Sequence, residues 1–259
     1  MIKRVFLYLL FTLFLPTILD AQNFPSIKDY FNSGISIRGG ISHLVLKDEF
    51  ISQEKYAGFA PYYALDWSNI HDSYGFHFTM DLINTNELKN YNMSAKMIEC
   101  SMSLGYMYDI GNTELYSRKI YFMLGPAPEI YIHFRSQNIA KGGLAIFDAY
   151  SFAALFSVGI RLDAYYPINN DFALAGSLQS SLISLAAKYI DPENKSKSLI
   201  KITAPYSDGK YSFEASAAFS YFRPIKFQAG YKFKFIRLTS WDYMASAGDN
   251  LFLTLTYML

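Results

Sequence analysis

The sequence predicts an all-β fold, an up-and-down antiparallel transmembrane β-barrel of ten strands, with eight or twelve strands as alternatives. The first observation is the alternation of apolar and polar residues over Tyr211–Tyr221 and again over Ile225–Phe235, because period two gives a strand one apolar and one polar face. The second is composition: 17% of residues are charged and 18% are aromatic, whereas a soluble domain carries about 25% charge. Aromatic rings with a polar tip are favoured at lipid headgroups, so the composition indicates a membrane protein.

The N-terminus predicts export. Residues 1–21 have the form of a signal peptide, with Lys3 and Arg4 before an apolar run and Ala21 at the expected cleavage point. A transmembrane anchor is the alternative, but the apolar run is shorter than the ~20 residues that a spanning helix needs. We therefore expect residues 22–33 to form a periplasmic leader and residues 34–259 to form a barrel in the outer membrane of a Gram-negative bacterium.

Ten alternating segments follow the leader. They span Gly34–Leu46, Tyr56–Trp67, Ser73–Asn84, Asn92–Asp109, Glu114–Phe134, Asp148–Tyr166, Asp171–Lys188, Tyr211–Phe222, Ile225–Leu238 and Asn250–Leu259. Short connections alternate with longer ones. The longer set is Lys47–Lys55, Asn86–Tyr91, Arg135–Phe147, Tyr189–Lys210 and Thr239–Asp249. An even strand count with short periplasmic turns and longer outside loops is typical of outer-membrane barrels.

Tyrosine spacing predicts that the apolar face meets lipid. Tyr211 and Tyr221 are ten residues apart, which is ~33 Å along a strand and ~25 Å in height at a tilt of ~40°, about the height of the apolar band of such barrels. We predict an aromatic girdle of Tyr211, Tyr221 and Tyr257. A soluble barrel or sandwich is the alternative, but its strands usually run only about 5–6 residues. Pro61, and the pair Pro126 and Pro128, fall inside predicted strands, and each proline must cost a ladder bond at a kink or bulge.

The opposite face predicts a lumen lined by charges of both signs. The inward cations are Arg38, Lys119, Arg161, Lys226, Lys232 and Lys234, and the inward carboxylates are Asp66, Asp81, Glu99, Glu129, Asp163 and Glu214. A ring of one sign would indicate an ion-selective pore, whereas equal numbers indicate a structural network of paired groups that fills the interior. Open channels need about 16 strands. The three-residue turn predicts that Glu214 faces Lys232 at ~5 Å between Cβ atoms, as an ion pair.

Four segments resemble a known family. They are Gly34-Ile-Ser-Ile-Arg-Gly-Gly-Ile-Ser, Tyr121-Phe-Met-Leu-Gly-Pro, the strand that starts at Phe172, and Leu251–Leu259. They are similar to the opening, middle, late and closing strands of the outer-membrane β-barrel family that includes the PorT protein of the type IX secretion system, a porin-like barrel domain. The resemblance implies the barrel fold over nearly all of the mature chain. It does not by itself imply a secretion role.

No catalytic constellation, cofactor site or metal site is predicted. The single cysteine, Cys100, excludes an internal disulfide and lies in phase with outward residues. On one strand His77 and Asp81 would be ~13 Å apart, and Glu129 and His133 are spaced in the same way. We therefore expect that the chain is not an enzyme. A barrel enzyme that acts on envelope lipid or peptide stays as an alternative, because adjacent strands could bring such groups together.

The function expected from the sequence is an integral outer-membrane barrel with a largely filled lumen and a structural or partner-binding role. Membership of a secretion assembly and a narrow passive pore for small solutes are the alternatives. Expected partners are outer-membrane lipid and lipopolysaccharide, the barrel assembly machinery during insertion, and envelope or secretion-system proteins, without nucleic acid. The lysine-rich connection Tyr189–Lys210 is either a contact for lipopolysaccharide phosphates or a solvated loop.

Overall fold

The computed structural model describes residues 33–49, 52–71, 73–90, 94–116, 118–141, 144–168, 172–190, 199–203, 208–222, 224–239 and 243–259. The predicted signal peptide and nearly all of the leader lie outside these ranges. The strands are β1 (Gly34–Asp48), β2 (Ser52–Ile70), β3 (Tyr74–Lys89), β4 (Ser94–Leu115), β5 (Arg118–Lys141), β6 (Leu144–Pro167), β7 (Phe172–Ile190), β8 (Leu199–Thr203), β9 (Gly209–Phe222), β10 (Ile225–Leu238) and β11 (Met244–Met258). Within the described ranges, no helix has the length and apolarity needed to cross a bilayer.

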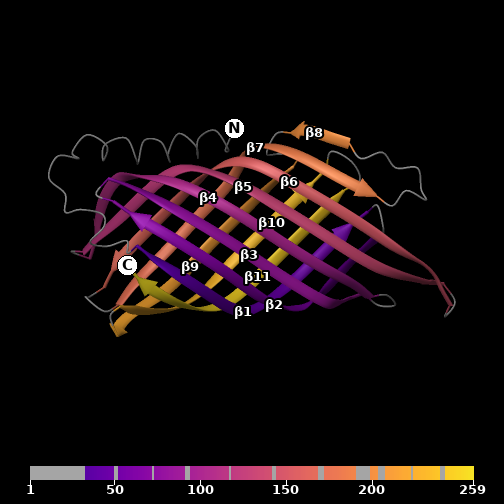
Figure 1. Cartoon of the computed structure of the whole chain (residues 1–259), viewed down its shortest axis with the longest axis horizontal. Helices are drawn as coiled ribbons and strands as arrows, with labels where there is room; N and C mark the ends of the chain where they lie inside the picture. The colour runs from indigo at the N-terminus through magenta and orange to yellow at the C-terminus, as the bar shows by residue number, and fades with distance from the viewer. Residues whose placement is uncertain are drawn as a thin grey trace.

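Ten of these strands close into an antiparallel barrel. Each pairs with its neighbours in the order β6-β5-β4-β3-β2-β1-β11-β10-β9-β7, and the pairing of β6 with β7 completes the circle (Figure 1). The predicted ten-stranded barrel is confirmed. The short strand β8 was not predicted, and it pairs only with the last part of β7.

The two ends of the barrel differ. We call the end that holds the start of β1 and the end of β11 the termini end, and the opposite one the far end; the C-terminus marks the termini end at the left of Figure 1. At the far end the strands continue into the predicted long connections, so that β5 and β6 reach 24 residues each. At ~3.3 Å per residue these two strands are ~80 Å long, or ~60 Å in height at a tilt of ~40°, far more than a band of ~25 Å. The prediction of long outer connections is therefore wrong for most of these segments, because strand occupies them.

The outer surface is apolar. Outward side chains such as Ile37 and Leu253 are 65% and 70% exposed, as lipid-facing residues of a barrel are. Near the termini end, Trp67 packs on Phe76, and Tyr74 stacks on Tyr106. Exposed Tyr257 lies at the same end.

The other residues of the predicted girdle lie in β9. Tyr211 stacks on Phe235 toward the far end. Tyr221 belongs to β9, but its side chain lies outside the described part of the structure. Cys100 lies on the outer face between exposed Ile98 and Leu104, in the predicted phase.

The prolines coincide with breaks in the ladders. The pairing of β4 with β5 lapses between Ser103–Glu129 and Tyr108–Leu124, opposite Pro126 and Pro128, and resumes in the same register. On its other side β5 pairs without interruption through both prolines. Pro61 lies in a similar irregularity between β2 and β3. The expected loss of ladder bonds is confirmed, and each strand still keeps its neighbour on one side.

The far half of the lumen holds two packed apolar clusters, which we call the apolar core. One cluster joins β1, β2, β3, β4 and β11 and comprises Leu44, Leu46, Tyr56, Ala60, Tyr62, Ala64, Ile83, Leu88, Ala95, Met97 and Phe252. A second cluster joins β5, β6, β7, β10 and β11 and comprises Tyr131, Ala153, Leu155, Ala186, Ile236, Leu238 and Met244. Buried charged side chains, among them Asp48, Arg135 and Lys188, lie in the same half. The far half of the lumen is therefore packed by apolar and polar side chains together.

Candidate functional site

Three buried ion pairs cross the middle of the lumen. Lys232 Nζ lies 2.8 Å from Asp81 Oδ2, and two further pairs join Lys234 to Glu99 and Lys210 to Glu129. All six side chains are at most 8% exposed. Neutral groups donate further hydrogen bonds to these carboxylates: the hydroxyl of Tyr62 donates to Asp81, and the amide of Gln179 donates to Glu129. We call these six residues the middle layer, and it separates the apolar core from the termini end.

The predicted inward residues are placed as follows. Asp81, Glu99, Glu129, Lys232 and Lys234 belong to the middle layer, and Arg38, Asp66, Arg161, Asp163, Glu214 and Lys226 lie nearer the termini end. Lys119 lies beside the β4–β5 connection, where its partner in the ladder is Glu114.

The predicted ion pair between Glu214 and Lys232 is not formed. The two residues do lie opposite each other in the ladder of β9 and β10, so the predicted register is confirmed. Their charged groups turn to other strands instead: Glu214 accepts from Arg38, and Lys232 donates to Asp81. Side chains in a narrow lumen reach across it, so the adjacent residue in a ladder does not decide the charge partner.

Sequence reasoning missed further lumen charges. Lys188, at the end of a predicted strand, and Lys210, in the predicted lysine-rich connection, are both buried. Lys188 Nζ lies 3.2 Å from Asp48 Oδ1, and Ser151 also donates to Asp48. A register shift between β6 and β7 at Val158 changes which residues of β7 face inward. That irregularity brings Lys188 into the lumen, and no pattern in the sequence marks it.

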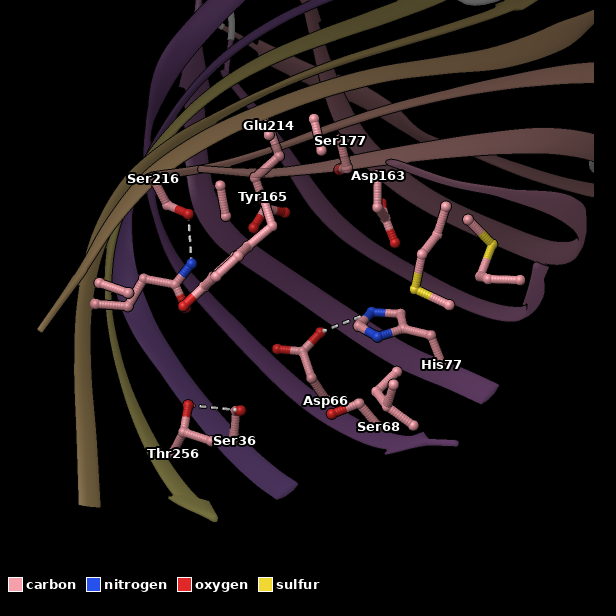
Figure 2. A pocket seen from close by; sticks show the side chains of 18 of the residues that line it. Ser36, Asp66, Ser68, His77, Asp163, Tyr165, Ser177, Glu214, Ser216 and Thr256 are labelled. Carbon is pink, nitrogen blue, oxygen red and sulfur yellow. Dashed lines mark hydrogen bonds and ion pairs between the residues drawn. The ribbon is translucent and has the colours of Figure 1, made fainter. Parts of the chain in front are cut away.

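A polar pocket occupies the lumen between the middle layer and the termini end. Its volume is about 130 Å³, enough for several water molecules. Side chains from all ten strands of the barrel line it, and those labelled in Figure 2 converge on one space, with Glu214 and Tyr165 facing Asp66 and His77. The pocket is the candidate functional site, because it combines space with charged side chains.

The cations of the pocket differ in whether they have a carboxylate partner. Arg38 binds two carboxylates, with Nε 2.5 Å from Asp66 and a terminal nitrogen 2.7 Å from Glu214. Arg161 pairs with Asp163 at 2.8 Å. Lys226 also lines the pocket, and no ion pair joins it to a carboxylate of the described residues.

An aspartate, a threonine and a histidine form a connected group on one wall of the pocket. Thr79 Oγ1 donates to Asp66 Oδ1 at 2.8 Å and lies 2.9 Å from His77 Nε2. Since the hydroxyl proton of Thr79 is used by Asp66, we assign the proton of the imidazole to Nε2, which leaves the Nδ1 lone pair free. His77 Nε2 is 3.9 Å from Asp66 (Figure 2). The sequence analysis considered His77 with Asp81, which lies on the same strand. The carboxylate that lies near His77 is instead that of Asp66 on β2.

The described residues contain no group of three His, Cys, Asp or Glu side chains that could hold a metal ion. No protein-family model matches the chain, and no curated protein matches it. Solved structures do match. The outer membrane protease OmpT from Escherichia coli superposes with a TM-score of 0.52 at 11% identity, over 92% of this chain and 99% of OmpT. The chain has the fold of an outer-membrane β-barrel.

Two further solved barrels are more distant. The translocator domain of the autotransporter NalP from Neisseria meningitidis has a TM-score of 0.45 at 10% identity, covering 89% of this chain and 90% of that domain. Neisserial surface protein A has a TM-score of 0.37 at 12% identity, covering 87% of this chain and 97% of its own. A shared fold does not by itself assign a role.

The expectation that the chain is not an enzyme is overturned. It rested on the separation of histidines and carboxylates along single strands, and the closed barrel instead brings Asp66 and His77 together from adjacent strands. The fold is also one that carries an enzyme, since the superposed OmpT is a protease. At 11% identity the likeness concerns the fold alone.

Proposed function

We propose that this protein is an integral outer-membrane barrel that is closed to passage through its lumen and that binds a polar ligand in the pocket at its termini end. The observation that carries the proposal is the order of the layers along the lumen. A polar pocket lies at the termini end, three buried ion pairs lie above it, and the far half is filled by the apolar core together with the buried ion pair of Lys188 and Asp48. A narrow passive pore would need an open path, whereas the side chains of the middle layer and of these clusters are buried.

The orientation follows from the connections. At the termini end residues 71–73, 116–117, 168–171 and 223–224 separate consecutive strands of the barrel, whereas the longest connection, residues 191–208 with β8, lies at the far end. Short turns of outer-membrane barrels lie in the periplasm. The ligand therefore reaches the pocket from the periplasm, and the far half of the barrel projects outward.

Planar-bilayer recording tests closure. We expect the wild-type protein to give no steady single-channel steps, and we expect none after Glu99→Ala and Lys234→Ala are combined, because the packed far half still closes the lumen. The control is Glu87→Ala with Lys89→Ala, an exposed ion pair on β3. Steady steps from the wild-type protein would show a pore and end the proposal of a closed barrel.

Thiol labelling tests the direction of access. In a Cys100→Ser background, Ser177→Cys places a thiol in the pocket, and Glu87→Cys places one at the exposed far end. A maleimide attached to a polymer too large for outer-membrane pores should label Glu87→Cys in intact cells. It should label Ser177→Cys only after the outer membrane is permeabilised. Labelling of Ser177→Cys in intact cells would contradict a periplasmic opening.

The proposal also includes membership of an envelope or secretion assembly. Its support is the resemblance of four segments to the family that includes PorT, together with the periplasmic direction of the pocket. Copurification from gently solubilised membranes tests it: a stoichiometric envelope partner is expected, and recovery of the barrel alone would remove this part.

Hydrolysis is the second candidate function, favoured by the group of Asp66, Thr79 and His77. Its free imidazole nitrogen could take a proton from water as a general base, while Asp66 holds the ring through Thr79. Incubation with a mixture of fluorogenic peptides tests it. Turnover that is lost in His77→Gln and kept in His43→Gln, an exposed histidine on the outer face, would support a hydrolase. Equal turnover in both variants would exclude this histidine as the base.

A further inference from the structure

Lys226 differs from the other cations of the pocket. Arg38 and Arg161 are each neutralised by carboxylates at 2.5–2.8 Å. Lys226 lies on the inward row of β10, is largely covered, and has no ion pair with any of the described carboxylates. The charged group that acts on it is Arg38, which carries the same sign. A covered ammonium group without a counterion is costly in free energy, so this position favours an added anion.

The side chains beside Lys226 can donate further hydrogen bonds. Thr256 is its direct partner in the ladder, and Ser36 is the next residue across β1. The hydroxyls of Ser36 and Thr256 share one hydrogen bond of 2.8 Å (Figure 2). One bond uses only one of two hydroxyl protons, so the other can donate into the pocket.

A second pair of donors lies on the other side of Lys226. The amide of Gln228 donates to the hydroxyl of Ser216. This leaves one amide proton of Gln228 and the hydroxyl proton of Ser216 available. Both residues line the same pocket. Lys226 therefore shares the pocket with several groups that can donate, and the carboxylates of the pocket lie with the two arginines.

We propose that Lys226, with Ser36, Thr256, Gln228 and Ser216, forms an oxyanion-binding site for the carboxylate or phosphate group of a small periplasmic solute. An ammonium group with several neutral donors is the arrangement that binds an oxyanion, because charge-assisted hydrogen bonds to it are the strong ones. The inference rests on the proposed function, since it names the ligand class of the same pocket. A small solute fits the cavity of about 130 Å³.

The test is thermal unfolding of the detergent-solubilised protein, followed by tryptophan fluorescence, in inorganic phosphate, acetate or chloride at equal ionic strength. A bound ligand at about 100 times its Kd should raise the unfolding midpoint by roughly 5 °C. We expect phosphate or acetate to raise it above the value in chloride for the wild-type protein. A rise with phosphate alone assigns the site to phosphorylated solutes, and a rise with acetate assigns it to carboxylates.

Three variants make the test specific. Lys226→Met should lose the anion-dependent rise, and Lys226→Arg should keep it because the charge is retained. Lys89→Met removes an exposed lysine at the far end and should behave as the wild type. Each variant is compared with itself in chloride, so a change in its basal stability does not affect the result.

The contrary results are distinct. An equal anion-dependent rise in Lys226→Met would place the anion elsewhere and overturn the inference. Absence of any rise in the wild-type protein would also overturn it. If the pocket thiol at position 177 is then still labelled only from the periplasmic side, the proposed pocket stands and only its ligand class is wrong. If that labelling fails as well, the proposed function fails with it.

Discussion

Glu214 and Lys232 face each other directly across the ladder of β9 and β10, yet each forms its ion pair with a residue of a different strand. Lys232 reaches Asp81 on β3 at 2.8 Å, and Glu214 reaches Arg38 on β1 at 2.7 Å. The lumen charges therefore connect strands that are not neighbours in the sheet. These contacts brace the barrel across its interior, in addition to the ladders around its wall.

The buried ion pair of Asp81 with Lys232 should stabilise the fold far more than an exposed ion pair does. Asp81→Asn leaves a buried ammonium group without its counterion and should lower the free energy of unfolding by about 3–5 kcal/mol. Glu87→Gln breaks the exposed pair with Lys89 and should change it by less than about 1 kcal/mol. Urea unfolding in lipid vesicles measures both. A double-mutant cycle that gave Glu214 and Lys232 the larger coupling would contradict the observed pairing.

The apolar core of the far half should behave as the interior of a soluble domain does. Leu46→Ala removes a fully buried side chain and should lower the free energy of unfolding by about 2–5 kcal/mol. Ile41→Ala, on the lipid-facing side of the same strand and 60% exposed, is the matched control and should cost less. Equal losses in the two variants would mean that the lumen at Leu46 is not packed.

Gly125 should be required for closure of β5 against β4. A Cβ atom there would lie 1.9 Å from the carbonyl oxygen of Tyr106, within the segment where the ladder lapses. Gly125→Ala should therefore lower the folded fraction, seen as the band of altered mobility when the unheated protein is run on a gel. Gly39→Ala, whose Cβ would meet nothing within 4 Å, should fold normally, and a folding defect of equal size there would refute this account.

The free-energy cost of a charged substitution on the outer surface should depend on how deep the residue lies in the membrane. Leu253 is four residues before Tyr257 on β11, ~10 Å above it at a tilt of ~40°. Leu253→Arg should cost about 2–4 kcal/mol, the value near the bilayer midplane. Ile202→Arg, on β8 at the far end and 81% exposed, should cost less than about 0.5 kcal/mol. Urea unfolding in lipid vesicles measures both changes in the free energy of unfolding. Equal costs for the two variants would contradict the proposed position of the membrane along the barrel.

The barrel wall could be predicted from the sequence because its signal is local. Alternation with period two fixes which residues of β9 and β10 face out, and the turn length fixes that Phe213 opposes Phe233. The strand ends at the far end were harder to predict, because Leu44 to Leu46 is apolar on both faces and interrupts the alternation. That run was assigned to the end of a strand, although the strand continues.

The candidate site could not be predicted, because its contacts depend on the offset between strands around the whole barrel. The contact between His77 and Asp66 needs the register of β2 with β3, which also contains the irregularity at Pro61. The burial of Lys188 needs the shift at Val158. Distances along single strands, which placed His77 far from Asp81, say nothing about such contacts.

The apolar core has a consequence for how the barrel is completed. Leu44 from the first strand and Phe252 from the last belong to one cluster, so the seam between β1 and β11 is held by side chains inside the lumen as well as by its ladder. An open sheet on the way to closure would leave these side chains in water, and only the final pairing dehydrates them. The pairing of β1 with β11 and the burial of these side chains therefore occur together. Partly closed forms are destabilised as a result, and closure of the barrel is cooperative.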